Sequence, residues 1–137
     1  HVMAALFFNM KASVNWLLAH PTPRACLVCS GTHEENSYED MLGAGAFADL
    51  LISSFSASDN PPLYSDSVLA CRLLYQQAAQ KGLPEHFSLS RNGKALHSIP
   101  ALVQDVAFSS RSDLFNFSIL LCKDGALRTS QNQILGV

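Results

Sequence analysis

The chain has 137 residues, of which 48% are hydrophobic and 15% are charged, and its formal net charge is −2. This composition is typical of a globular protein, and the length fits a single domain over residues 1–137. The small negative charge argues against nucleic acid and against an anionic membrane surface as partners. Rich apolar content with low surface charge is compatible with a homodimer.

The cysteines and the N-terminus indicate a compartment. Four cysteines are too few for the disulfide framework of a small secreted protein, and we expect the C-x-x-C pair, Cys26 and Cys29, to be buried rather than redox-active or zinc-bound. The apolar run Val2–Phe8 is too short to span a membrane, and no basic segment precedes it. A cytoplasmic location is the resulting expectation.

The first part of the chain reads as strand, helix and strand. Val2–Phe8 is continuously apolar, as in a strand covered on both faces, and Asn9 ends it. Lys11–His20 has apolar residues at helical spacing, and prolines follow it. Arg24–Ser30 is a second apolar run. The order predicts a βαβ unit with a parallel sheet.

The next helix is predicted from Ser37 to about Ile52. Ser37 is a good N-cap, and Asp40 stands three residues later, where a capping box has its acid. Gly43 and Gly45 lie in the helix interior, where each costs about 1 kcal/mol relative to alanine. Such a cost predicts that another backbone lies close by, and we expect this backbone to belong to a sheet.

The rest of the chain alternates loops and short elements. Ser53–Tyr64 is the clearest loop, and Ser65 or Asp66 begins a helix that Gly82 and Pro84 end. For residues 85–99 the local signals allow either a hairpin at Asn92-Gly93 or short helices with Ser90 as N-cap, and we favour the helices.

The C-terminal part is predicted to close the sheet. A helix should run from Pro100 through Phe108, and a strand over Leu114–Cys122 should turn at Asp124-Gly125 into a short antiparallel partner, Ala126–Thr129. The whole order predicts an α/β fold, namely a three-layer α/β/α arrangement with a mostly parallel, mixed sheet and an antiparallel edge hairpin.

The loop Gly31–Asn36 is the first candidate for a binding site. It leads from the predicted end of a strand into a helix N-terminus, where free backbone N–H groups and the helix dipole favour anions. Ligands of open α/β sheets collect at this edge.

The same junction carries a family resemblance. Cys29-Ser30-Gly31-Thr32, a variable turn, Ser37-Tyr38-Glu39-Asp40 and then Gly43-Ala44-Gly45-Ala46 resemble the pattern of the 2-phosphosulfolactate phosphatase family. Segments on both sides agree, but only the C-terminal portion of the family is matched. The resemblance implies a Mg²⁺-dependent phosphatase that hydrolyses 2-phosphosulfolactate, a small phosphorylated and sulfonated acid, to sulfolactate and phosphate. In some organisms this step leads towards coenzyme M.

Two adjacent acids are the candidates for catalysis and for the metal. Mg²⁺ prefers one or two carboxylates together with water and phosphate oxygens, and Glu39 and Asp40 lie beside the expected phosphate loop. The alternative is that both acids only complement the helix dipole.

Four further residues are candidates for phosphate or substrate binding. Gly31 and Thr32 could offer a backbone N–H and a hydroxyl, although a tight turn would need the same residues. His33 could act as acid or base, or could belong to a solvated turn. Asn9 ends the first strand at the same expected edge, where asparagine is also an ordinary terminator.

A different class of function stays open because the family's N-terminal half has no counterpart here. The chain could be a non-catalytic, stand-alone half that binds small anions, or an oligomeric scaffold in which two copies meet across an apolar surface.

Overall fold

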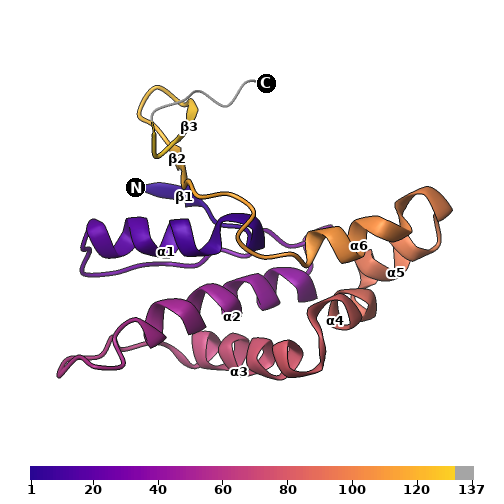
Figure 1. Ribbon diagram of the computed structural model, residues 1–137, viewed down its shortest axis with the longest axis horizontal. Helices are drawn as coiled ribbons and strands as arrows, with labels where there is room; N and C mark the ends of the chain where they lie inside the picture. Colours follow the sequence, from indigo (N-terminus) through magenta and orange to yellow (C-terminus); the bar gives the residue numbers. More distant parts are fainter. Residues whose placement is uncertain (132–137) are drawn as a thin grey trace. The chain divides into compact units, whose positions relative to one another are not determined.

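The structure is a computed structural model that describes residues 1–131, and it divides the chain into two compact units (Figure 1). The first unit combines His1–Ala25 with the chain from Ser112 onward, and the second is Cys26–Arg111. The expectation of one domain over residues 1–137 stays a prediction. None of the helices between residues 1 and 131 is both long and apolar enough to cross a membrane.

Among the described residues, the first unit combines helices with one small sheet, and the regular elements of the second unit are all helices. The first unit contains β1 Val2–Ala4, the 3₁₀ helix η1 Phe7–Asn9, α1 Met10–Ala19, β2 Ile119–Leu121 and β3 Leu127–Thr129. The second unit contains α2 Tyr38–Ser53, α3 Asp66–Lys81, α4 Leu83–Leu89, α5 Arg91–His97, the 3₁₀ helix η2 Pro100–Leu102 and α6 Val103–Ser109.

The sheet of the first unit has the order β1-β2-β3, and both pairs are antiparallel. The predicted hairpin is confirmed in its turn and pairing, since Gly125 turns the chain with φ +81° and β2 pairs with β3. Its first strand is shorter than the predicted Leu114–Cys122, because only Ile119–Leu121 is a strand. Helix α1 confirms the predicted helix, and its N-terminus is capped from a distance, because Asp113 Oδ1 accepts a hydrogen bond from Lys11 N at 2.7 Å.

The first predicted strand is wrong beyond its start. Only Val2–Ala4 is extended, and the chain then turns into η1. Asn9 makes this turn, because its Oδ1 accepts from Leu6 N at 2.8 Å and its Nδ2 donates to Ala4 O at 3.2 Å. Val2 is 62% exposed, so β1 is not covered on both faces.

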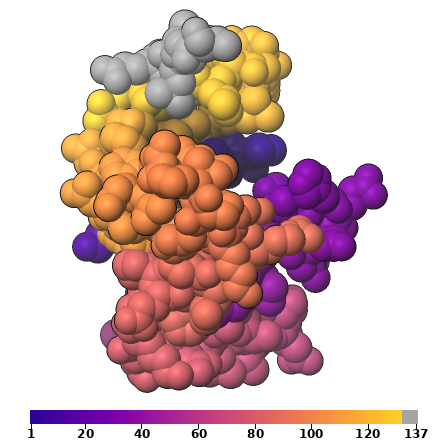
Figure 2. Space-filling model, turned by 90° about the vertical axis from the view of Figure 1, so that its right-hand side faces the viewer, coloured from indigo at the N-terminus to yellow at the C-terminus, as the bar shows by residue number. Residues whose placement is uncertain are grey.

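The helices of the second unit follow the local sequence signals. Ser37, Ser65 and Ser90 each cap a helix, since their side chains accept from Asp40 N, Val68 N and Gly93 N. The choice of short helices over a hairpin for residues 85–99 is therefore confirmed. Figure 2 shows the outer surface of α4, α5 and α6, which face the viewer in salmon to orange.

The second predicted strand, Arg24–Ser30, does not form. Cys26 and Cys29 are exposed rather than buried, and Val28 is 86% exposed. An apolar run becomes a strand only where a neighbouring strand supplies backbone partners. In the part of the chain that the structure describes, no strand pairs with this run, and the expected neighbour β1 pairs with β2.

The close approach predicted for the helix glycines is confirmed at Gly45, where its partner is a helix, and for Gly43 it stays a prediction. A Cβ at Gly45 would lie 2.1 Å from Cys71 O, so α2 presses on the backbone of α3 and not on a sheet. The two helices run side by side (Figure 1). Asp49 of α2 accepts from both Arg72 Nε and Gln76 Nε2 of α3, at 2.8 and 2.7 Å.

The fold therefore combines helices with strands, but its sheet is antiparallel. The mostly parallel sheet that we expected is wrong for residues 1–131, whose strand pairs are antiparallel, and the three-layer α/β/α arrangement stays a prediction. Within residues 1–131, strands from distant parts of the sequence pair only in the first unit, and the regular elements of the second unit are all helices.

Candidate functional site

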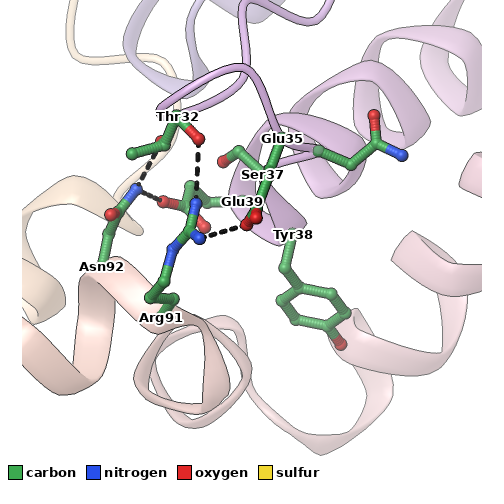
Figure 3. A pocket seen from close by; sticks show the side chains of 8 residues that line it. Thr32, Glu35, Ser37, Tyr38, Glu39, Arg91 and Asn92 are labelled. Atoms are coloured by element: carbon green, nitrogen blue, oxygen red, sulfur yellow. Dashed lines mark hydrogen bonds and ion pairs between the residues drawn. The ribbon is translucent and has the colours of Figure 1, made fainter.

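A pocket of about 220 Å³ lies where the loop before α2 meets the first turns of α2 and α5, all within the second unit (Figure 3). The loop and α2 supply most of its wall, and α5 supplies two polar side chains. The lining residues are Thr32, Glu35, Asn36, Ser37, Tyr38, Glu39, Arg91 and Asn92.

A tight turn shapes one side of this pocket. Thr32 N donates to Glu35 O at 2.9 Å, and Glu35 N donates back to Thr32 O at 3.1 Å. The two residues between them, His33 and Glu34, both have left-handed φ, of 51° and 62°. Two left-handed residues between paired ends are typical of a type I′ turn, which prefers asparagine and glycine. Both side chains are exposed at the tip, and neither lines the pocket.

The turn is held by the first two residues of α5. Arg91 forms an ion pair with Glu35, and its Nη2 donates to Thr32 O at 2.9 Å. Asn92 Nδ2 donates to Thr32 Oγ1 at 2.9 Å and to Glu39 Oε1. The dashed lines of Figure 3 mark these contacts, which connect α5 with the loop and with α2.

Glu39, a predicted catalytic residue and metal ligand, is part of the pocket wall. Burial raises the pKa of its carboxyl, but hydrogen bonds from its own backbone N–H and from neighbouring side chains, Asn92 first among them, outweigh burial. The pKa is therefore held below its usual 4.5. Glu39 is thus ionised at neutral pH and can accept a cation or a proton.

Asp40, predicted for the same roles, does not line the pocket. Its Oδ2 accepts from Gly31 N at 2.8 Å and from Ser30 Oγ at 3.3 Å. The N–H of Gly31, which we expected to face phosphate, is thereby bound to a carboxylate of the protein itself. This contact lets Asp40 anchor the loop, and the ligand roles of both residues stay predictions.

The remaining candidates differ in their surroundings. Thr32 reaches the pocket through its hydroxyl. His33 stands outside at the tip of the turn. Asn9 belongs to the first unit, where it is buried and bonded to local backbone. The structure therefore groups Thr32 with Glu39, and it does not add His33 to that group.

Sequence reasoning missed the residues that face Glu39 and Glu35. Arg91 and Asn92 follow the predicted cap Ser90, so their place in a first helical turn was foreseeable. Nothing local indicates that this turn meets residues 32–39, because more than 50 positions separate them.

A partly buried aromatic pair adjoins the pocket and was also missed. Tyr38 Oη lies 2.8 Å from His86 Nδ1, and the two rings stack at an angle of 18°. The ring of Tyr38 points away from the side chains of Arg91 and Asn92 (Figure 3). The pair therefore fixes the first residue of α2 against α4.

No group of three or more His, Cys, Asp and Glu side chains within residues 1–131 is placed to hold a metal ion. Mg²⁺ needs no such group, since one or two carboxylates with water and substrate oxygens are its usual ligands.

Comparison with known proteins gives a consistent result. Residues 1–124 match the family described as 2-phosphosulpholactate phosphatase. A probable 2-phosphosulfolactate phosphatase of Gloeothece citriformis is 30% identical over 92% of this chain and 50% of its own length. A protein with the same description from Pseudothermotoga lettingae is 27% identical over 88% of this chain and 49% of its own length. One from Prochlorococcus marinus (strain MIT 9313) is 39% identical over 50% of this chain and 28% of its own length.

The chain spans about half the length, or less, of these curated relatives. The match nevertheless covers most of the chain, and it includes the loop, the first turn of α2 and the start of α5. The chain belongs to the 2-phosphosulfolactate phosphatase family.

Proposed function

We propose that this chain supplies the acidic and anion-facing wall of a Mg²⁺-dependent phosphatase site that hydrolyses 2-phosphosulfolactate to sulfolactate and phosphate. One observation carries the proposal: an ionised carboxylate, Glu39, shares a pocket with the donors Arg91 and Asn92. A phosphatase needs such a combination, because it must bind both a cation and an anionic ester. The same proposal includes that this reaction is a step towards coenzyme M in some organisms.

The donor set of the pocket fits Mg²⁺. Glu39 offers a charged oxygen, Thr32 a hydroxyl, and Glu35 a second carboxylate. These hard oxygen ligands are the type that Mg²⁺ selects. Glu39 would hold the ion, whereas Asp40, the other predicted ligand, already has one oxygen bound to Gly31 and Ser30. When bound, Mg²⁺ would neutralise charge on the phosphoryl oxygens and acidify water.

The chain's own residues would bind and orient the substrate. In the hydrolysis a water oxygen adds to phosphorus, the ester P–O bond breaks, and the leaving oxygen takes a proton. Arg91 would present N–H donors to anionic oxygens, while Glu39, which accepts from Asn92, would take positive charge or a proton. The ion pair of Arg91 with Glu35 must open for this binding.

The second candidate is a non-catalytic half that binds small anions or acts as an oligomeric scaffold. The observation that favours it is that Asp40, one of the two predicted metal ligands, is bonded to Gly31 and Ser30 and does not line the pocket. We also predict that the chain forms a homodimer and that it is located in the cytoplasm.

Phosphate release tests the two candidates. The assay uses 2-phosphosulfolactate and a panel of phosphomonoesters, with and without Mg²⁺, for the wild type, Glu39→Gln and the matched control Glu34→Gln. Catalysis predicts Mg²⁺-dependent release that falls at least about 100-fold in Glu39→Gln and is unchanged in Glu34→Gln, since Glu34 does not line the pocket. No release from folded protein with any ester would favour the binding or scaffold role.

A further inference from the structure

The pocket already contains one anion bound to its arginine. The carboxylate of Glu35 pairs with one nitrogen of Arg91, and the other nitrogen donates to the carbonyl of Thr32 (Figure 3). A guanidinium that binds an oxyanion uses the same two nitrogens as a fork. Glu35 therefore occupies the position that an anionic ligand of this pocket would take.

This internal ion pair is accessible to solutes. The side chain of Arg91 is 51% exposed and that of Glu35 is 68% exposed. Exposed ion pairs add little stability, because water and salt screen them and because ordering two long side chains costs entropy. A ligand can therefore replace Glu35 at small cost.

The turn that carries Glu35 does not depend on the ion pair. Its ends are joined by two backbone hydrogen bonds between Thr32 and Glu35. The Glu35 side chain can consequently leave Arg91 while the turn keeps its backbone, and Thr32 O continues to position the guanidinium.

The two carboxylates of the pocket have different partners. Arg91 pairs with Glu35, while the next residue, Asn92, donates to Glu39 and Thr32. A ligand can therefore displace Glu35 from Arg91 without removing Asn92 from Glu39.

We propose that Arg91 is a specificity-determining residue that binds a tetrahedral oxyanion of the substrate, and that Glu35 is an internal stand-in which this oxyanion displaces. The inference rests on the proposed function, since the oxyanion is part of the substrate proposed there. A sulfonate and a phosphoryl group share the required chemistry, namely a tetrahedral centre with at least two free oxygens.

Anion binding without Mg²⁺ and without turnover tests this inference. Methanesulfonate and methyl phosphate are titrated at constant ionic strength into the ¹⁵N-labelled chain, and shifts of the Arg91 side-chain and Thr32 backbone signals are followed. The wild type is compared with Glu35→Gln, Arg91→Gln and Glu34→Gln. Glu34 is the matched control, because it lies one position away, carries the same charge and does not line the pocket.

The expected result is a contrast between the two glutamates. Glu35→Gln should tighten binding about 3- to 10-fold, since it removes the competing carboxylate, whereas Glu34→Gln should change it less than about 2-fold. Arg91→Gln should weaken binding at least about 10-fold. Whichever anion binds more tightly identifies the substrate group at Arg91.

Two results would overturn the inference: equal effects of Glu35→Gln and Glu34→Gln, or undiminished binding in Arg91→Gln. If Arg91→Gln does not fold, the anion affinities of Glu35→Gln and Glu34→Gln still test the inference. Failure here differs from failure of the phosphatase proposal. Anion binding at Arg91 with no phosphate release would leave this inference standing alone, and Glu39-dependent release with an unchanged KM in Arg91→Gln would remove only this inference.

Discussion

Glu39 and Asp40 are neighbours in sequence, yet they serve two different regions of the molecule. Asp40 turns to the loop behind it and accepts from Gly31 N and Ser30 Oγ. Glu39 turns to the pocket and accepts from Asn92. Successive residues of an α-helix point about 100° apart, so one first turn can serve a scaffold on one side and a ligand on the other.

The carboxylates of Glu39 and Asp40 carry the same charge but have different physical roles. The Asp40 carboxylate satisfies a backbone N–H of a loop that would otherwise lack a partner, which is a contribution to stability. The Glu39 carboxylate is paired with a side-chain amide that a cation or a ligand can replace. The region around Asp40 should therefore govern folding, and the region around Glu39 should govern binding.

The largest stability effect is expected on the Asp40 side. Asp40→Ala leaves Gly31 N–H without its acceptor and removes an acid from the first turn of α2, and it should lower the free energy of unfolding by about 1–3 kcal/mol. Asp40→Asn keeps an oxygen acceptor and should recover most of this loss. Urea denaturation followed by circular dichroism measures both variants.

Glu39→Gln is the reference for that measurement. It removes the charge on the pocket side alone and should cost less than Asp40→Ala. Equal losses in the two variants would contradict the division of the first turn into a scaffold side and a ligand side.

Local sequence signals predicted the helices correctly, because a helix depends mainly on residues close to one another in the sequence. The caps Ser37, Ser65 and Ser90 and the turn at Gly125 each act within four residues of their own position. The antiparallel sheet was not predictable in this way, because strand pairing depends on distant partners, and the expected parallel pairing was wrong. The run Arg24–Ser30 has the composition of a buried strand but no neighbour that pairs with it within residues 1–131.

The sequence likewise predicted the part of the candidate site that depends on local signals, and it did not predict the part that depends on distant contacts. Glu39 and Thr32 stood out because they follow a loop that enters a helix, and both line the pocket. Arg91 and Asn92 could not be found, because their contacts with this loop bridge more than 50 positions. His33 was attractive for its chemistry, but its left-handed backbone places it at the tip of a turn.

A smaller effect is expected in the turn that connects the two regions. Glu34 has φ +62°, a conformation that costs a residue with a Cβ about 1 kcal/mol or more and costs glycine almost nothing. Glu34→Gly should therefore raise the free energy of unfolding by about 0.5–1 kcal/mol after the loss of chain entropy is subtracted.

The matched control for this turn is Glu34→Ala, which removes the same charge but retains the Cβ. It should bring no gain. A gain of equal size in both variants would mean that the charge of Glu34, and not its backbone conformation, limits the stability of the turn. Thermal unfolding of the two variants distinguishes these causes.

The smallest expected effect is a pH dependence that belongs to the pocket side. Hydrogen bonds to the charged form hold the pKa of Glu39 below its usual 4.5, so the folded state binds this proton less readily than the unfolded state. The stability that Glu39 contributes is then fully present above about pH 5 and is lost as the pH falls through its lowered pKa. The difference in unfolding free energy between the wild type and Glu39→Gln should shrink on acidification. If the difference in unfolding free energy instead stays constant or grows, Asn92 does not favour the ionised form of Glu39. The assignment of Glu39 as a charged acceptor in the pocket would then be contradicted.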